Sequence, residues 1–408
     1  DRTCCKWSRK PEGRVTQRGA ERAGQQGGGG SLALILFIQA IERAAWNGLA
    51  PQLPEMARTL GASEGRAAFY LSIFLLVTYV AAYPLARLTD KYLRPGWWCC
   101  IGLVLLSIGY LLLGLRWVVP AAALLPIGFA FSRLGIGLSV TSLDAKKQPS
   151  WWLIHLAVNI GAACGGWLAQ QIAWRAGLPA VCRACALATL LASLLCILLR
   201  SPRAAEAPKD GPADHCMVAA RWWAVRCICL LTIGTWVAAL QPLTSMVLFA
   251  GRASPWLGPI HLGVGSYASL LAGQVIMVVC VALALRRTSA SVLASVWAML
   301  ISAAGFAVLA GAALRTPPLS PLWLISAYAL LSIAEPYLFV AGVRSIERLA
   351  PTGYQGRAFG AWYGSVGLGL FAGSLFGLCW DRLEASAYFA LLALALIGNA
   401  ALLSRVAG

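Results

Sequence analysis

A glutamine, a glutamate and an arginine lie close together in an apolar stretch of the chain, where charged side chains are costly. Gln39, Glu42 and Arg43 occur in a run that begins near Ser31. On a helix, Gln39 shares a face with Glu42 and Arg43, and Trp46 follows one turn later. Because each charge in a membrane helix costs about 2.5 to 3.5 kcal/mol on insertion scales, we expect this face to line a protein cavity, with acid and base partly compensating each other. The alternative is an ion pair that only locks two helices together.

The composition predicts the kind of element that positions these residues. Of 408 residues, 59% are hydrophobic and 12% are charged. Apolar runs of about 20 residues, long enough to span a bilayer, recur along nearly the whole chain, without strands of alternating polarity. We therefore expect an all-α integral membrane protein. The formal net charge of +18 arises mostly in short connections between spans, which indicates membrane topology and not nucleic-acid binding.

The apolar segments predict twelve transmembrane helices in two six-helix bundles. They lie at approximately 32–50, 66–86, 97–115, 119–142, 150–173, 178–199, 222–249, 260–285, 290–314, 321–347, 356–379 and 385–407. Residues 1–30 should form a disordered basic cytoplasmic tail. A polar linker at 200–221 separates an N-terminal bundle, 31–199, from a C-terminal bundle, 222–408. Two such halves with charges inside the membrane are typical of transporters that rock around a midplane site.

The basic residues of the connections predict the orientation. With the amino terminus inside, the cytoplasmic connections hold fifteen Lys or Arg and the outer connections and their flanks hold eight. Because basic residues accumulate on the cytoplasmic side, we expect both termini to be cytoplasmic, with the plasma or inner membrane as the location. The connection after the second span resembles a signature of the major facilitator superfamily, Asp-Arg/Lys-x-x-Gly-Arg, although the glycine before its acid is missing. That resemblance implies a gating role for Asp90 and Lys91.

Several further patterns resemble those of one family, the proton-dependent oligopeptide transporters (POT or PTR family). The first-helix motif of that family, Glu-x-x-Glu-Arg-Phe-x-Tyr-Tyr-Gly, is similar to the stretch Gln39-x-x-Glu42-Arg43-x-x-Trp46-Asn47-Gly48. Its fifth-helix signature, Phe-Tyr-x-x-Ile-Asn-x-Gly-Ser, is similar to the stretch from Ile154 to Ala162. Its tenth helix and the following loop resemble the stretch from Pro321 through Glu335 to Gly356. Span seven adds Trp236 and Gln241, where the family places a Trp and a Gln. The resemblance covers essentially all twelve spans in order.

The resemblance implies a secondary active transporter that moves di- and tripeptides with protons by alternating access. Glu42 and Glu335 match family acids of proton coupling and peptide binding, and Arg43 matches the basic residue beside the first of these acids. Asn159 matches an amide that contacts the peptide. The proton is then the coupling ion and no cofactor is expected. The expected partners are a small peptide and the lipid bilayer, with the protein as a monomer.

The residues themselves allow that chemistry. A dipeptide is a zwitterion, so its site needs a cation for the carboxylate and an anion for the amine, placed apart on opposing helices. Arg43 and Arg133 can serve the first need and Glu335 the second. Glu42 beside Arg43 can change its protonation state when a substrate competes for the arginine.

The chain also departs from the family pattern. Gln39 replaces the first motif glutamate, which removes one titratable group. Trp46 and Asn47 replace two tyrosines that line the family pocket. Gly137 stands where the family commonly has a lysine in span four, and we expect Arg133, four residues earlier on the same helical face, to supply the missing positive charge.

The other predicted substrate-binding residues are His155, Asn159, Trp236 and Gln241, and each has a plainer interpretation. His155 and Asn159 share a face of span five, where a lone histidine is more often a hydrogen-bonded packing residue. Gln241 lies beside Pro242, whose ring should bend span seven, and that bend can be structural only.

Three other functions compete with peptide transport. A non-transporting or sensor relative is favoured by Gln39 and by the loss of the motif tyrosines. A transporter of the same fold could carry another small solute. An enzyme is poorly supported, since the chain has three histidines and no His-Glu-x-x-His motif. The cysteines are scattered without a completing second cluster, so we expect no metal site.

Overall fold

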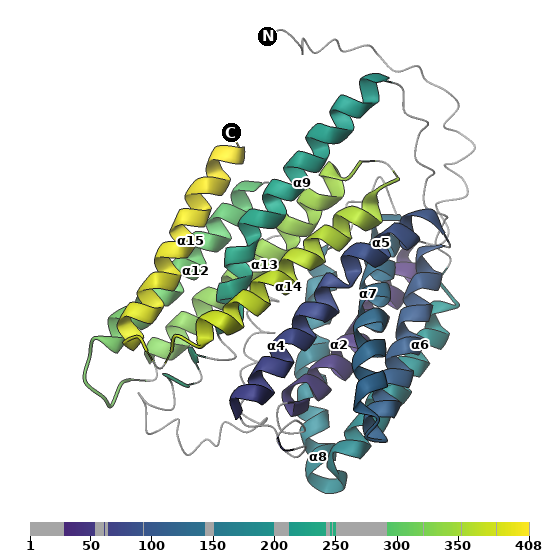
Figure 1. The fold of residues 1–408 in the computed structure, drawn as a ribbon, viewed down its shortest axis with the longest axis horizontal. Coiled ribbons are helices and arrows are strands. Elements are labelled where there is room, and N and C mark those ends of the chain that lie inside the picture. The colour runs from purple at the N-terminus through teal and green to yellow at the C-terminus, as the bar shows by residue number, and fades with distance from the viewer. Residues whose placement is uncertain are drawn as a thin grey trace.

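The fold was analysed in a computed structural model. It describes residues 28–53, 61, 64–92, 94–142, 151–199, 212–241, 245–246, 248–249, 292–320, 322–351, 353–380 and 382–407. Every regular element in these ranges is helical (Figure 1). Ten helical stretches among them are long and apolar enough to cross a membrane. The prediction of an all-α, multi-pass membrane protein is confirmed to this extent, whereas the described ranges do not establish twelve spans.

The helices of the N-terminal half bring together the residues singled out above. They are α2 (Gly28–Leu49) with the short 3-10 helix η1 (Ala50–Gln52), α4 (Glu64–Val80), α5 (Ala82–Lys91), α6 (Pro95–Gly114), α7 (Val118–Ser142) and α8 (Trp151–Cys196). The second predicted span is divided into α4 and α5. Pro84 explains the division, because it cannot donate a hydrogen bond to Val80 and its ring crowds that carbonyl.

The fifth and sixth predicted spans both lie in α8, which has 46 residues. Their boundary is Gly177, whose φ of 74° is outside the helical region. Glycine adopts this conformation without a Cβ penalty, so the chain can change direction here and begin the next helical segment at Pro179. The predicted gap between the two spans therefore coincides with a kink at a single residue.

The C-terminal half contributes α9 (Pro212–Ala239), α12 (Val292–Ala313), α13 (Leu322–Leu349), α14 (Gln355–Gly377) and α15 (Ala385–Ala407). Helix α9 begins at Pro212 and not at 222, so helix extends into the predicted linker. Proline is well accommodated in the first turn of a helix, where its missing N–H has no intrahelical partner in any case. The predicted eighth span, 260–285, and residues 1–27 of the predicted tail, 1–30, lie outside the described residues. The last residues of that tail are helical, because α2 already begins at Gly28.

Close backbone contact joins α2 to α8 in the N-terminal half. A methyl group added at Gly161 or Gly165 of α8 would collide with the backbone of Ala40 or Ala44 of α2. Small residues permit such close approach between helices in membranes. The contact flanks Glu42 on both sides along α2, so the packing of these two helices fixes the position of its carboxylate.

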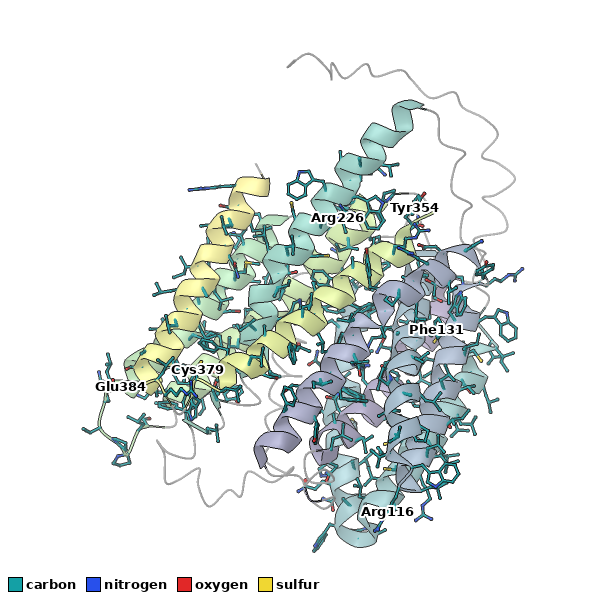
Figure 2. All side chains as sticks on the ribbon, in the orientation of Figure 1. Arg116, Phe131, Arg226, Tyr354, Cys379 and Glu384 are labelled. Atoms are coloured by element: carbon teal, nitrogen blue, oxygen red, sulfur yellow. The ribbon has the colours of Figure 1, made fainter. Side chains whose placement is uncertain are left out.

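The two halves meet chiefly along α14, which packs against α9 in its own half and against α4 and α5 in the other (Figure 1). Helices α8 and α13 form a second contact between the halves. Figure 2 labels Arg226 and Tyr354 toward one end of the bundle and Arg116, Cys379 and Glu384 toward the other.

Candidate functional site

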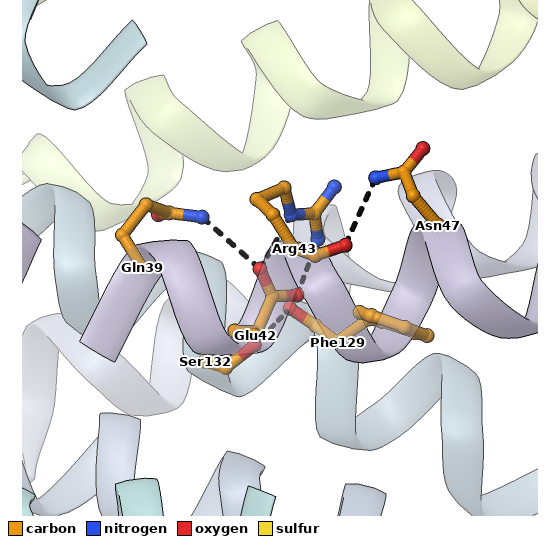
Figure 3. Close-up of polar contacts among 6 residues, drawn as sticks. All are labelled: Gln39, Glu42, Arg43, Asn47, Phe129 and Ser132. Carbon is orange, nitrogen blue, oxygen red and sulfur yellow. Dashed lines mark hydrogen bonds and ion pairs between the residues drawn. The ribbon is translucent and has the colours of Figure 1, made fainter. Parts of the chain in front are cut away.

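Glu42 forms the centre of a polar cluster inside the N-terminal half. Its side chain is fully buried, at 0% exposure. Arg43 donates to both carboxylate oxygens, one from Nε and one from a terminal guanidinium nitrogen, and Gln39 Nε2 donates to Oε2 at 3.0 Å (Figure 3). The structure thus brings together the three residues whose spacing predicted a common face of α2. The buried carboxylate is held by three N–H donors, all from its own helix.

Arg133 of α7 is a second buried cation, and its terminal nitrogens are unpaired. The residue is 5% exposed, and neither Nη1 nor Nη2 has a hydrogen-bond partner among the described residues. Its guanidinium carbon lies 3.9 Å from the ring centre of Tyr79, 5.2 Å from that of Phe129 and 6.0 Å from that of Tyr363. Aromatic faces stabilise a guanidinium by cation–π attraction but do not use its in-plane N–H groups. A carboxylate, which can accept two parallel hydrogen bonds, is the natural complement of those groups.

Phe129 connects the two cations. The guanidinium carbon of Arg43 lies 5.7 Å from the centre of the ring that Arg133 approaches at 5.2 Å. Arg133 also interacts electrostatically with both Glu42 and Arg43. With the acid ionised, this cluster of one carboxylate and two guanidinium groups has a net charge of +1, located at Arg133.

Trp46 and Asn47 complete the α2 side of the cluster. The Trp46 ring stacks on Phe74 at 5.8 Å and meets the edge of Phe129 at 4.4 Å. Asn47 is half-buried, and its Nδ2 donates to the backbone carbonyl of Arg43 at 3.0 Å. The indole therefore fixes the Phe129 ring under the arginines, while Asn47 is adjacent to the cluster without joining its hydrogen bonds.

His155 and Asn159 lie at the contact between α8 and α13. Asn159 Nδ2 donates to the His155 carbonyl at 2.9 Å and lies 3.2 Å from His155 Nε2. The His155 ring packs 4.9 Å from that of Phe339 of α13, and its Nδ1 has no partner within the described part of the chain. Both residues therefore lie where the two halves face each other.

The predicted residues of the C-terminal half divide into two groups. Glu335 lies at the middle of α13 and is half-buried. The Trp236 ring of α9 meets that of Trp362 of α14 at 6.1 Å. Gln241 lies elsewhere: it is fully buried, its Oε1 accepts from Tyr388 at 2.7 Å and from Ser245 at 2.8 Å, and its Nε2 donates to Val237 at 3.0 Å. The structure therefore places Gln241 in a hydrogen-bond network that joins α9 to α15.

Asp90 joins the two halves at one end of the bundle. Its carboxylate accepts hydrogen bonds from the backbone N–H groups of Gly356, at 2.5 Å, and Arg357, at 3.1 Å, and pairs with Arg357 Nε at 3.5 Å. A carboxylate at a helix N-terminus satisfies otherwise unpaired N–H groups and interacts favourably with the helix dipole. Lys91, the second predicted gating residue, is exposed, and its ammonium lies 5.1 Å from the ring of Tyr92.

A second cross-half contact at the same ends of the helices was not predicted. Trp151, the first residue of α8, donates from Nε1 to Glu347 Oε2 of α13 at 2.8 Å. Tryptophan at a span end is typical of an interfacial anchor, and Glu347 lies among basic residues, so the sequence does not predict that these two side chains meet. The aromatic residues around Arg133 were also missed. The only signal for them was the spacing of Phe129 four residues before Arg133.

The chain was compared with known families and proteins. No protein-family model matches it. In sequence it is 24% identical, over an alignment of 444 residues, to the peptide transporter YePEPT of Yersinia enterocolitica subsp. palearctica serotype O:3. The alignment covers 84% of this chain and 86% of that protein.

Solved structures share the fold over nearly the whole chain. A peptide transporter POT in complex with sulfate matches with a TM-score of 0.72 at 15% identity, over 96% of this chain and 99% of that one. A bacterial homologue of the human drug peptide transporters PepT1 and PepT2 matches at 0.69 and 19% identity, over 92% and 97%. The human organic anion transporter MFSD10 matches at 0.74 and 13%, over 93% and 100%. The chain therefore has the fold of the POT-family peptide transporters and is similar in sequence to one peptide transporter.

Proposed function

We propose that this protein is a secondary active transporter that carries di- and tripeptides together with protons by alternating access. The observation that carries the proposal is the guanidinium of Arg133, whose two terminal nitrogens have no hydrogen-bond partner among the described residues. It is buried beside the Glu42–Arg43 pair and is approached by Tyr363 from the other half. A buried cation without a hydrogen-bonding partner is costly. An anionic group of a substrate would supply the missing hydrogen bonds.

Each pole of a peptide has a complementary group in the proposed site. Arg133 binds the terminal carboxylate through Nη1 and Nη2, and the neighbouring Arg43 reinforces it. Glu335, at the middle of α13 in the opposite half, binds the terminal ammonium. Trp46, Asn47, His155, Asn159 and Trp236 provide the walls, and Glu42 exchanges the coupling proton.

The proposal includes the architecture and orientation on which alternating access depends. We propose twelve spans in two six-helix bundles, with both termini cytoplasmic and the protein monomeric in the plasma or inner membrane. In this orientation, the contact of Asp90 of α5 with the start of α14 lies at the cytoplasmic end. The hydrogen bond from Trp151 to Glu347 lies at the same end. These contacts then hold the cytoplasmic side closed, and transport requires them to open.

Uptake of a labelled dipeptide into proteoliposomes under an inward proton gradient tests the proposal. We expect uptake above that of empty liposomes, and at least a tenfold loss in Arg133→Ala, because a hydrogen-bonded charge pair contributes about 1.5 to 3 kcal/mol. Arg133→Lys should retain part of the activity, since it keeps the charge and loses the planar fork. The exposed Arg175→Ala serves as the control and should match the unmodified protein. Unchanged uptake in Arg133→Ala would exclude Arg133 from the site.

A second candidate is transport of another small anion. The net charge of +1 around Arg133 favours it, because that charge can bind an anion that has no ammonium group. Competition separates the two functions: dipeptides should inhibit uptake strongly if peptides are the substrate, whereas simple carboxylates without an amine should inhibit better if they are. Specific binding of a peptide without any flux would instead indicate a sensor.

A further inference from the structure

Gln39 is the uncharged one of the two side chains that hydrogen-bond the Glu42 carboxylate within the described part of the chain. It is 6% exposed, and its Nε2 donates to Glu42 Oε2 at 3.0 Å. A side-chain amide has both a donor and an acceptor end, so after rotation it can hydrogen-bond either an ionised or a protonated carboxyl group. Gln39 can therefore accompany Glu42 through a protonation cycle without binding a proton itself.

The sequence limits the groups that can carry protons through the middle of the membrane. Glu42 and Glu335 are the two acidic residues in the interior of the predicted spans. Asp90 and Glu347 lie at span ends, and residues 242–291 contain no Asp or Glu. In the function proposed above, on which this step rests, Glu335 must stay ionised to hold the substrate ammonium. Glu42 is then the remaining carboxyl group for proton exchange.

The surroundings of Glu42 contain no further acid among the described residues. Arg43 pairs with it from α2, and Arg133 of α7 interacts with it electrostatically. Similar interactions come from the neutral side chains of Tyr110 and Cys99 in α6. Helix α8, which packs on α2, presents the Cys185 thiol to the carbonyl of Ala45 at 3.3 Å. Glu42 therefore faces two permanent cations and otherwise neutral groups.

Helix α13, which carries Glu335, packs against α8, α9, α12 and α14. Helix α12 has no titratable side chain along Val292–Ala313. The other helices contribute Arg221 and Arg226 from α9, Arg357 and Tyr363 from α14 and His155 near the start of α8, among other side chains. Arg357 and His155 lie toward the helix ends from which Asp90 and Trp151 join the halves, whereas Arg226 and Glu335 are each at the middle of their own helix.

We propose that Gln39 confines proton binding to Glu42, so that the carrier moves one proton with each peptide. The substrate carboxylate binds Arg133 and, across Phe129, attracts Arg43 away from Glu42. Glu42 then takes one proton from water, and the Gln39 amide rotates so that its oxygen accepts the new O–H. When the peptide leaves on the other side, Glu42 releases the proton, Arg43 returns, and Gln39 Nε2 donates again.

Counting charges gives a measurable consequence. Glu42, Arg43, Arg133 and Glu335 sum to zero in the empty site, and a zwitterionic peptide adds nothing. One proton makes the loaded carrier +1. With one proton per peptide and no pH difference, a membrane potential of about 59 mV then balances a tenfold peptide gradient. With two protons per peptide, a membrane potential of about 30 mV would balance the same gradient.

The experiment measures this reversal potential for dialanine in proteoliposomes, with the voltage set by a potassium gradient and valinomycin. We expect about 59 mV for the unmodified protein. Gln39→Glu adds a second carboxyl group beside Glu42. The two cations Arg43 and Arg133 can hold both carboxylates ionised in the empty carrier, so that both take up a proton on loading and the reversal potential should fall to about 30 mV. Gln39→Met, of similar size and without a titratable group, should remain at about 59 mV with slower flux.

Several results would overturn the proposal. A value of about 30 mV in the unmodified protein, or flux that does not respond to voltage, excludes a single proton. If Gln39→Glu and Gln39→Met have the same reversal potential, Gln39 does not set the number of protons that move with each peptide. Should Gln39→Glu fail to fold, Glu42→Gln provides the second test: dialanine counterflow should persist, and dependence on voltage and pH should disappear. Absence of dialanine counterflow in the unmodified protein would reject the proposed function itself, whereas counterflow with a wrong potential rejects only the stoichiometry.

Discussion

The carboxylate of Asp90 accepts a hydrogen bond of 2.5 Å from the backbone N–H of Gly356, so that a side chain of one half caps a helix of the other. The capping group must leave α14 whenever the halves separate at this end. In the proposed transport cycle, the bond therefore contributes directly to the equilibrium between the closed and open arrangements of this end.

Replacing Asp90 by Asn should weaken the contact that holds the two halves together at this end of the bundle. The amide keeps an acceptor but loses the negative charge at the start of α14, which is worth about 0.3 to 2 kcal/mol. We expect the amides of Gly356 and Arg357 to exchange hydrogen up to about thirtyfold faster. Lys91→Gln, at the exposed neighbouring position, is the control. Equal exchange in both variants would show that Asp90 does not hold this end closed.

Trp151→Phe should weaken the second contact between the halves. The substitution removes the indole N–H that donates to Glu347 and retains an aromatic ring against Phe359, which Trp151 meets at 5.8 Å. A hydrogen bond to a charged group contributes about 1.5 to 3 kcal/mol. We expect a lower melting temperature in detergent than for Trp152→Phe, whose indole makes no such bond among the described residues. Melting temperatures in the reverse order would contradict the assignment.

Gly165→Ala should destabilise the N-terminal half. Its new methyl group would collide with the backbone of Ala44 on α2, and overpacking costs about 1 to 3 kcal/mol. Gly398→Ala in α15 is the matched control, because nothing lies within 4 Å of its added methyl group. That variant should be as stable as the unmodified protein or more so, since alanine favours helix. Thermal unfolding in detergent measures both, and equal melting temperatures would show that α2 can move away from α8 without penalty.

Tyr388→Phe distinguishes a packing role of Gln241 from substrate binding. It removes the hydroxyl that donates to Gln241 Oε1 at 2.7 Å and leaves the ring in place. We expect a loss of about 1 kcal/mol in stability with an unchanged KM for dipeptide uptake. A raised KM at equal stability would instead connect this network to the substrate.

The sequence was sufficient to predict the cluster on α2, because helical spacing alone brings Gln39, Glu42 and Arg43 to one face. It was also sufficient for the burial of Arg133, since a lone arginine in an apolar span must face the protein interior. The aromatic residues around Arg133 come from three helices, and their convergence depends on how those helices pack. No local pattern encodes that packing.

Gln241 and Trp151 show a related limit. A glutamine beside a proline in span seven resembles a site residue, yet its hydrogen bonds depend on Tyr388, which is distant in sequence. Trp151 resembles a membrane anchor until α13 brings Glu347 beside it. In the same way, the division between α4 and α5 follows from Pro84, whereas the continuity of α8 across the predicted gap depends on one backbone angle at Gly177.

The glycine and alanine contact between α2 and α8 has a mechanical consequence. Because the two backbones touch on both sides of Glu42, α2 cannot slide or rotate along α8 without steric collision. The distance from Glu42 to the C-terminal half then changes only when one half moves as a rigid body against the other. In the transport cycle proposed above, proton exchange at Glu42 is thereby tied to the same displacement that exposes the substrate to one side of the membrane or the other.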